Sequence, residues 1–362
     1  MGTITERKRK NGEVVFFAQV VKKGGGKVHR ESQTFERRKA AQVWIEKRER
    51  ELNEPGGIER ARLGDPLLGE VIDRYVAESE RALGKTKTQV LRSLKGDAIA
   101  EMKCSDIKSN DVIDLARRLR ADRKPQTVMS YLSHLAAIFA VAKPAWGVEL
   151  DQQAMKDAFV VGRRLGVICK GASRERRPSC DEIKAILGLF RQKLAAKPDM
   201  SPMPDLVAFA LFSTRRQEEI TRIEWRDFEP ENKRVLVRDM KNPGDKIGNN
   251  VWCDLPEPAI KIIERQPRKS DRIFPYTTDA LSSNFTRACK FLMIEDLHFH
   301  DLRHEGVSRL FEMGLNIPHV AAVSGHRSWQ SLKRYTHIRA SGDKWVWLAE
   351  EMSGAGAPPE VA

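Results

Sequence analysis

The spacing of hydrophobic residues predicts a small β-sheet and one helix at the start of this 362-residue chain. Residues 14–21 are rich in strand-forming side chains, and residues 29–35 form a second such run after a turn of three consecutive glycines. Residues 37–52 carry apolar side chains at helical spacing. We therefore predict a β-sheet-plus-helix module over residues 1–54. A linker rich in Pro, Gly and charged residues follows over 55–64.

The next hundred residues have the apolar spacing of a helical module, which we place over residues 65–163. Asp65 is a candidate N-cap for the first helix, which is expected to run to about Ala82. Later helix starts are expected at Thr86, Ser109, Pro125 and, more weakly, Gln152. A basic stretch that ends in a proline, residues 164–178, is predicted to be a second linker.

The rest of the chain combines helices with one predicted β-hairpin. Val235-Leu236-Val237 and Val251-Trp252 are strand-like and flank a polar turn region. Helices are expected over residues 182–194, 206–211, 256–265, 278–292, 301–313, 317–324 and 343–352. We predict a mixed α/β module over 179–349 and a C-terminal tail over 350–362. The fold class is thus multidomain and mainly α with small β-sheets, an α+β chain.

Charge and cysteine content narrow the class of protein. The formal net charge is +14, and residues 1–62 alone hold 16 Lys/Arg against 9 Asp/Glu, a balance typical of proteins that bind a polyanion. The five cysteines are widely spaced without a CxxC pair, which argues against a disulfide framework or structural zinc and favours a reducing cytosol. We find no apolar run of 18 residues and no apolar signal core at the N-terminus. We therefore expect a cytoplasmic protein that makes no use of a membrane.

The segment from His298 to His337 is the richest in side chains that could act in catalysis. It contains six of the chain's eight histidines. His300 and Arg303 are three residues apart and so share a helix face. A Gly325-His326 turn follows, and Tyr335 comes nine residues after His326. Arg suits bidentate contact with phosphate, His exchanges protons near neutral pH, and Tyr can be a covalent nucleophile. These types together suggest nucleophilic attack on a phosphodiester.

This pattern, H-x-x-R, then G-H, then Y nine residues later, resembles the C-terminal signature of the tyrosine recombinases, or phage integrases. The sequence FHDLRHEG…SGHRSWQSLKRYTH is most similar to integrases of phages and genomic islands and to shufflon-type invertases. The family also has an upstream arginine in a T-G-x-R-x-x-E-I pattern. Here the segment reads Ser213-Thr214-Arg215-Arg216-Gln217-Glu218-Glu219-Ile220, so the register places the family arginine on Arg216. The family lysine of the β-hairpin matches Lys241, with Lys246 as its rival.

The resemblance implies a reaction and a role for each matched residue. Tyr335 would attack a phosphodiester of duplex DNA, and the 3′-phosphotyrosyl bond would later be resealed by a 5′-hydroxyl. Arg216 and Arg303 would neutralise the phosphate, and Lys241 would protonate the leaving oxygen. The remaining roles are assistance to Tyr335 by His300, a hydrogen bond to phosphate from His326, and support of His300 or Arg216 by Glu219. No metal, ATP or other cofactor is implied.

The family resemblance extends to the first two modules. Residues 1–54 look like an arm-type DNA-binding domain, and 65–163 look like a helical core-binding (SAM-like) domain. We expect DNA contacts from basic residues at strand ends and from polar residues at helix starts: Arg7, Lys8, Arg9, Lys10, Lys22, Lys23, Lys85, Lys87, Gln126, Thr127, Ser130 and His134. The implied partners are double-stranded attachment sites, a homotetramer on two sites, and a DNA-bending or directionality factor.

Several alternatives stay open from the sequence. The reaction could be integration, excision or shufflon-type inversion, or strand relaxation as in a type IB topoisomerase. A non-catalytic DNA-binding regulator is a further possibility, because Ser213-Thr214 replaces the usual Thr-Gly. His300 and His304 lie at i,i+4 as in half a zinc site, but Asp301 stands where a metalloprotease has Glu. His298 and His304 are interpreted as structural or DNA-facing. The apolar helix over 343–352 can fold back on its own domain, and the resemblance implies that it docks on a neighbouring protomer.

Overall fold

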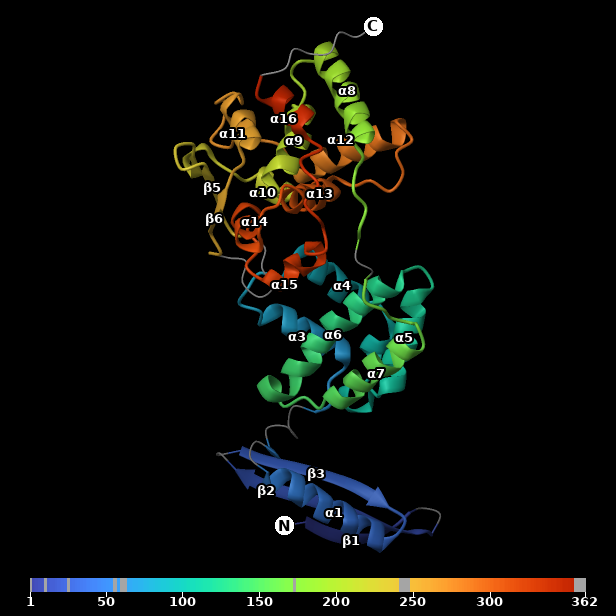
Figure 1. Cartoon of the computed structure of the whole chain (residues 1–362). Coiled ribbons are helices and arrows are strands. Elements are labelled where there is room, and N and C mark those ends of the chain that lie inside the picture. The colour runs from blue at the N-terminus through green and yellow to red at the C-terminus, as the bar shows by residue number, and fades with distance from the viewer. Residues whose placement is uncertain are drawn as a thin grey trace. The chain divides into compact units, whose positions relative to one another are not determined.

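The computed structural model describes residues 2–9, 12–24, 27–54, 57–58, 64–171, 174–240 and 248–354. The chain divides into two compact units, residues 1–173 and 174–362. Figure 1 shows a sheet with one helix and a helical cluster in the first unit, and a larger helical body with a small sheet in the second. Mainly α content with two small antiparallel sheets confirms the predicted fold class.

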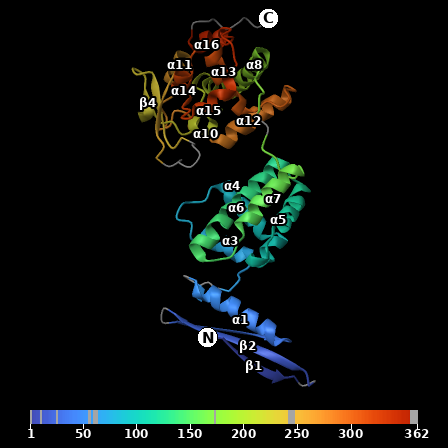
Figure 2. The same ribbon diagram turned by 60° about the horizontal axis from the view of Figure 1, so that its bottom comes forward.

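The N-terminal sheet has three antiparallel strands in the order β1-β2-β3. They are β1 (Gly2–Lys8), β2 (Val14–Gly24) and β3 (Lys27–Phe35), and α1 (Arg38–Asn53) packs along the central strand. Ala18 and Val20 of β2 are fully buried against Ala41 of α1, and Figure 2 shows the helix lying across the strands. The β1 strand was not predicted, because its sequence GTITERK is short, polar and largely exposed. Ile58, predicted to be in the linker, joins this core.

The helical module contains five α-helices and two short 3₁₀ helices among its described residues. These are α3 (Leu68–Ala77), α4 (Lys85–Lys95), η1 (Ala98–Glu101), η2 (Cys104–Asp106), α5 (Ser109–Arg120), α6 (Pro125–Trp146) and α7 (Gln152–Arg164). The predicted Asp65 cap is wrong: α3 begins at Leu68, and the Asp65 carboxylate accepts hydrogen bonds from the backbone and hydroxyl of Ser105. Residues expected in the second linker also belong here, since Ile168 is buried in this core.

The α6 helix is the hydrophobic centre of this module. By length and composition alone it could cross a membrane, and it is the single helix of the described residues that meets both criteria. Its apolar side chains, however, form the module's core: Val128, Leu132, Leu135, Ile138, Phe139 and Ala142 are all buried. The apolar character of α6 is therefore explained by packing against α4, α5 and α7.

The second unit packs its helices around a main hydrophobic core and a smaller cluster. Its helices are α8 (Cys180–Ala196), α9 (Met203–Ser213), α10 (Gln217–Ile220), η3 (Trp225–Asp227), α11 (Glu257–Glu264), α12 (Thr278–Phe291), α13 (Phe299–Glu312), α14 (Ile317–Ser324), α15 (Trp329–Leu332), η4 (Lys333–Tyr335) and α16 (Val346–Met352). The smaller cluster is formed by α13, α14, α15 and η4. Its sheet is β4 (Phe228–Glu229), β5 (Arg234–Val237) and β6 (Val251–Asp254), antiparallel in that order. Ser179 caps α8 and Asn316 caps α14.

The α13 helix lies at the centre of this unit, in contact with α9, α12 and α14 (Figure 1). It is buried along most of its length, including the charged residues Asp301, Arg303, Glu305 and Arg309. Buried charges are costly unless they are paired. The hydrogen-bonded partners of these charged side chains therefore stabilise the position of α13.

Two segments outside the helix supply those partners. From the start of the unit, Arg174 binds Asp301 at 2.6 and 2.7 Å, and Arg177 binds Glu305 at 2.6 and 2.9 Å. From the C-terminal side, Asp343 binds Arg309, and the indole of Trp345 donates to Glu305 at 2.8 Å. We call these four residues the α13 clasp. The prediction that 164–178 is a simple linker is thus wrong at its end, because Arg174 and Arg177 are bound within the second unit.

The α16 helix packs on its own unit, in contact with α9 and α11. Trp345, Leu348 and Met352 are buried in the main core, and the Arg265 guanidinium donates to the Met352 carbonyl at 3.1 Å. The helix thus folds back on its own unit, and docking on a neighbouring protomer stays a prediction. Its apolar face is already occupied by the chain's own core, and the helix extends past the predicted domain end at residue 349.

Candidate active site

Four matched side chains from three segments meet at one place in the second unit. Arg216 and Glu219 begin α10, Arg303 lies on α13, and His326 follows the end of α14. Glu219 Oε1 accepts from Arg216 Nη1 at 2.5 Å, and its Oε2 lies 3.8 Å from Arg303 Nη1. Arg303 Nη2 lies 3.2 Å from His326 Nε2. The carboxylate of Glu219 thus lies between the two guanidinium groups, and the imidazole of His326 lies against the Arg303 guanidinium.

The turn before Arg216 adopts the conformation that the family glycine would give. Thr214 has φ +57°, in the left-handed region that disfavours a β-branched residue. Its carbonyl accepts a hydrogen bond from the Arg303 guanidinium. The replacement of Thr-Gly by Ser-Thr therefore preserves the turn at some conformational cost. Gly306 makes room for this turn: a Cβ there would lie 2.1 Å from the Leu211 carbonyl oxygen.

Arg215 and Arg216 have different environments. Arg215 is fully buried and donates to the carbonyls of Ser213 and Val323, which makes it a brace between α9 and α14. Arg216 retains 28% exposure of its side chain. Of the two, Arg216 is the one whose guanidinium can reach a phosphate from solvent. This agrees with the register that singled out Arg216.

Arg303 is held by acceptors that leave it charged. Besides Thr214, the Ser324 carbonyl accepts from Nη2 at 3.1 Å. Burial, and then the charge of Arg216, lower the pKa of Arg303 to about 9, so it remains cationic at neutral pH. Burial raises the pKa of Glu219, but the charges of Arg215, Arg303 and Arg216 outweigh burial and hold it below its ordinary value. The Glu219 contacts favour the support of Arg216 over the support of His300.

His326 follows a tight turn at Gly325, which ends α14 with φ +70°. A Cβ on Gly325 would lie 2.5 Å from the methyl carbon of Met240, so the hairpin packs directly beneath this turn. Burial and the charges of Arg303, Arg216 and Arg215 lower the pKa of His326 to about 3. The ring is therefore neutral. Because guanidinium only donates, Nε2 accepts from Arg303 and the Nδ1 proton points to Ser324 Oγ, 2.7 Å away.

Tyr335 lies at the edge of this group, on η4. Its ring is 6% exposed and stacks on Phe311. Its hydroxyl lies 2.6 Å from Nδ1 of His304. Burial raises the pKa of Tyr335, although Arg334 and Arg303 oppose the rise, so the resting phenol keeps its proton. His304 was predicted to be structural or DNA-facing. Its position directly after Arg303 in the sequence gives no indication of this contact.

His300 is exposed on α13, and its ring stands 4.9 Å from the His304 ring in a T-shaped arrangement. Partial burial of the ring, and then the charges of Arg303 and Arg216, lower its pKa. Among the described residues His300 has no hydrogen bond to Tyr335. His300 lies near the candidate site, because its ring is next to that of His304 and its pKa responds to Arg303 and Arg216. The direct contact with the phenol of Tyr335 is made by His304.

Lys241 and Lys246 lie outside the described residues, as does Lys10. The described end of the hairpin is Met240, whose backbone pairs with Asn249 at 2.8 Å. Since Met240 also packs under Gly325, the chain enters the lysine-bearing segment next to the His326 turn. Lys241 therefore remains a proposal that rests on this connection and on the family pattern.

The predicted DNA-binding residues of the first unit fall into separate groups. Arg7, Lys8 and Arg9 are exposed at the end of β1, whereas Lys22 and Lys23 lie near the end of β2, at the opposite end of the sheet. In the helical module, Lys87 bonds the Tyr75 hydroxyl at 2.6 Å and, after burial, its charge lowers the pKa of His134. Lys85, Gln126 and Thr127 are exposed, and Ser130 is half-buried.

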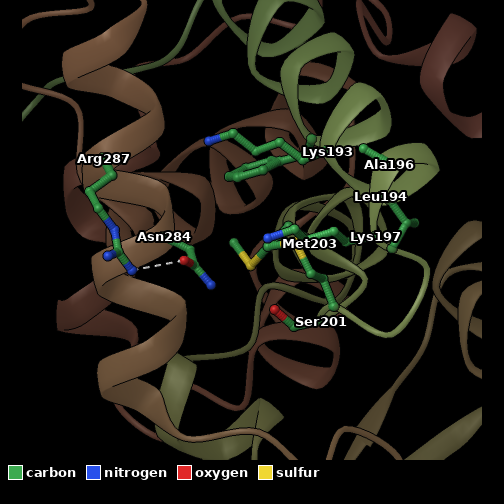
Figure 3. Close-up of a pocket in the computed structure, with 10 residues that line it drawn as sticks. Lys193, Leu194, Ala196, Lys197, Ser201, Met203, Asn284 and Arg287 are labelled. Carbon is green, nitrogen blue, oxygen red and sulfur yellow. Dashed lines mark hydrogen bonds between the residues drawn. The ribbon is translucent and has the colours of Figure 1, made fainter.

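Two other features of the described residues lie apart from this site. No group of three or more His, Cys, Asp or Glu side chains is arranged to hold a metal ion in the part of the chain that the structure describes. A cavity of about 460 Å³ opens between α8, the start of α9 and α12, with Lys193, Lys197 and Arg287 at its rim (Figure 3). It shares no residue with the arginine cluster. The candidate active site is therefore separate from this cavity.

Comparison with known proteins agrees with this geometry. Residues 179–341 match the phage integrase family. The chain is 31% identical to a shufflon-specific DNA recombinase of Escherichia coli, over 59% of this chain and 51% of that protein. It is 24% identical to the tyrosine recombinase XerA of Saccharolobus solfataricus, over 49% of this chain and 60% of that protein. The chain thus spans only about half the length of the shufflon recombinase.

The fold is also similar to that of solved structures. A lambda integrase dimer bound to a COC′ core site superposes with a TM-score of 0.58, covering 94% of this chain and 96% of that one at 18% identity. The likeness extends over both units, whereas the family match covers the second unit alone. Residues 179–341 are therefore a phage integrase family domain.

Proposed function

We propose that this protein is a site-specific DNA recombinase that cuts and rejoins duplex DNA through a 3′-phosphotyrosyl intermediate. The observation that carries the proposal is the convergence of Arg216, Arg303 and His326, with the phenol of Tyr335 within electrostatic range of Arg303. Two guanidinium groups at one point match the charge of a phosphodiester and of its pentavalent transition state. The neutral imidazole adds a hydrogen-bonding group, and the tyrosine adds the nucleophile.

In the proposed reaction, Tyr335 Oη bonds to phosphorus as the bond from phosphorus to the 5′-oxygen breaks. Arg216 and Arg303 hold the non-bridging oxygens. His326 gives up its bond from Arg303 and moves its proton to Nε2, which donates to the phosphate, while Nδ1 accepts from the hydroxyl of Ser324. Lys241 protonates the leaving 5′-oxygen. Since one phosphoester replaces another, the link retains its energy, and the reaction needs neither ATP nor a metal ion.

We propose that the first unit contributes DNA-binding surfaces. Arg7 and Lys22 stand about 23 Å apart by their positions along β2, at roughly 3.3 Å per residue, so they would bind different phosphates. Lys87 and His134 form a second candidate contact on the helical module. Double-stranded attachment sites are the proposed substrate and a homotetramer on two sites the proposed assembly, with a DNA-bending or directionality factor as a further partner. We place this activity in the cytoplasm, with the DNA.

The test is covalent capture of DNA by the full chain. A duplex selected from a random-sequence library by binding is nicked and incubated with the protein in chelator, and adducts are resolved on a denaturing gel. Wild type and the control Tyr276→Phe, altered at another tyrosine of the same unit, should form the adduct, and Tyr335→Phe should not. Binding without any adduct from wild type would favour a non-catalytic regulator. Relaxation of supercoiled DNA without site preference would favour a topoisomerase.

DNA inversion is the second candidate function. The observation that favours it is the 31% identity with a shufflon-specific recombinase. Paired copies of the selected site, placed inverted or direct on one plasmid, distinguish the outcomes. Inversion predicts that the segment between inverted copies is flipped, and integration or excision predicts products from direct or separate copies.

A further inference from the structure

The closest polar neighbour of the candidate nucleophile is a residue outside the family-matched set. The Tyr335 hydroxyl lies 2.6 Å from Nδ1 of His304, within the range of a strong O–H···N hydrogen bond. His304 projects from α13, and Tyr335 lies on η4, 31 residues later. Phe311 stacks on the phenol with the rings 15° from parallel and so fixes its plane. The contact is therefore supported by the packing of Tyr335 on α13, the helix that carries both His304 and Phe311.

The state of the imidazole makes it an acceptor for this proton. Burial, followed by the charges of His300 and Arg334, lowers the pKa of His304 to about 4, so the ring is neutral at pH 7. In the tautomer that carries its proton on Nε2, Nδ1 presents a lone pair to the phenol. Arg334 lies with its guanidinium carbon 5.4 Å from the centre of the phenol ring. Its charge favours the phenolate as the proton leaves.

We infer that His304 accepts the proton of Tyr335 as the phenol attacks the phosphodiester. The inference rests on the proposed function and adds a catalytic residue to it. As the bond from Oη to phosphorus forms, the phenol proton passes to Nδ1, and the bond from phosphorus to the 5′-oxygen breaks. That oxygen takes a proton from a separate acid, for which Lys241 is proposed. On resealing, the 5′-hydroxyl attacks and the His304 imidazolium returns its proton to Tyr335.

The same geometry explains why Tyr335 would not transfer its proton to His304 before a phosphate is bound. The resting phenol holds its proton more tightly than a free one, and His304 is a weaker base than a free imidazole. Transfer in the ground state is therefore unfavourable. It becomes favourable only as the phenol oxygen gives its electrons to phosphorus, which requires a bound phosphate. His300 has no hydrogen bond to Tyr335 among the described residues, so it is the matched competitor for this role.

The test separates the nucleophile side from the leaving-group side. The full chain is given the selected nicked duplex, and a second copy in which sulfur replaces the bridging 5′-oxygen, because a thiolate leaves without a proton donor. His304→Gln keeps an acceptor of similar size but cannot take the proton. We expect His304→Gln and His304→Ala to form adducts about 100-fold more slowly than wild type on both substrates. Added imidazole should restore part of the His304→Ala rate.

The controls fix what each outcome means. His319→Ala, altered at an exposed histidine on α14, should equal wild type, and His300→Gln gives the rate without the competitor. Thermal melting and DNA affinity of each variant exclude misfolding as the cause, and His304→Gln carries the test if His304→Ala is unstable. A His304→Gln rate within about threefold of wild type, or full recovery on the sulfur substrate, would overturn the inference. Absence of a wild-type adduct on both substrates would overturn the proposed function itself.

Discussion

Gly306 and Thr214 approach so closely that position 306 cannot carry a side chain without movement. A Cβ at Gly306 would lie 3.0 Å from Cγ2 of Thr214 and 2.1 Å from the carbonyl oxygen of Leu211. The first neighbour belongs to the turn that presents Arg216, and the glycine itself lies on the helix that carries Arg303. This contact therefore sets the separation of the two arginines.

Gly306→Ala should push α13 away from α9. We expect an overpacking cost of about 2 kcal/mol in the free energy of unfolding, measured by urea denaturation, together with a loss of covalent capture. Gly188→Ala is the matched control, because its Cβ meets nothing within 4 Å, and it should stabilise α8 by about 0.5 kcal/mol. Equal effects of the two substitutions would contradict the proposed close approach.

Glu305→Gln should be strongly destabilising. Glu305 is fully buried and binds Arg177, Lys344 and the Trp345 indole, so its neutralisation leaves cations near a buried site without their counter-charge. A cost of about 3 kcal/mol in the free energy of unfolding is expected. Glu149→Gln, which breaks a pair with Lys143 that is more than half exposed on both sides, should cost no more than about 0.5 kcal/mol.

The same carboxyl predicts a pH dependence of stability. Burial raises the pKa of Glu305, but its bonds to Arg177 and Trp345 outweigh burial and leave the pKa below the ordinary 4.5. Its ionised form thus stabilises the fold fully above that value, and the contribution is lost as the pH falls through the lowered pKa. The difference in unfolding free energy between wild type and Glu305→Gln should be constant near neutrality and shrink below about pH 4.5. A difference that grows in acid would refute this pairing.

Arg216→Lys should lower the rate of covalent capture about 100-fold and leave DNA affinity nearly unchanged. A lysine retains the charge but not the planar fork that binds Glu219 and phosphate together. The chain retains 63 other Lys and Arg residues for binding, since it holds 64 in total. Filter binding and the adduct gel measure the two quantities. Parallel loss of affinity would mean that Arg216 anchors DNA before it acts in catalysis.

Leu348→Ala tests the packing of α16 on its own unit. Leu348 is fully buried in the main core, whereas Val346 of the same helix is 47% exposed. We expect Leu348→Ala to cost about 3 kcal/mol in the free energy of unfolding at any protein concentration, and Val346→Ala to cost almost nothing. A cost that appears only at concentrations where the protein self-associates would instead indicate docking on a neighbour.

The elements that were predicted best have local signals. Ser179 and Asn316 carry cap side chains, and helical periodicity placed α14 at its observed residues. The β1 strand was missed because its exposed polar residues lack an apolar pattern, and it is held by pairing with β2. Strand pairing of that kind depends on a partner distant in sequence, which no local pattern reports.

The candidate site likewise combines residues that the sequence predicts with a contact that depends on tertiary packing. Residue types suggested Arg303, His326 and Tyr335, and the family resemblance added Arg216; the structure brings Arg216, Arg303 and His326 together. The role of His304 did not follow from its position beside Arg303. It depends on where η4 places the phenol, and that placement comes from packing against Phe311. The sequence register likewise could not reveal that Thr214 adopts a left-handed conformation.

The α13 clasp implies that the smallest autonomous fragment is longer than the stretch of family similarity. The match covers residues 179–341, yet Arg174 and Arg177 precede it and Asp343 and Trp345 follow it. A protein cut at those limits would keep Asp301, Glu305 and Arg309 buried while discarding these partners. Each unpaired buried charge costs several kcal/mol, and a whole domain is stable by only about 5–15 kcal/mol. A fragment that begins before Arg174 and ends after Met352 would retain a helix that the shorter one could not hold in place.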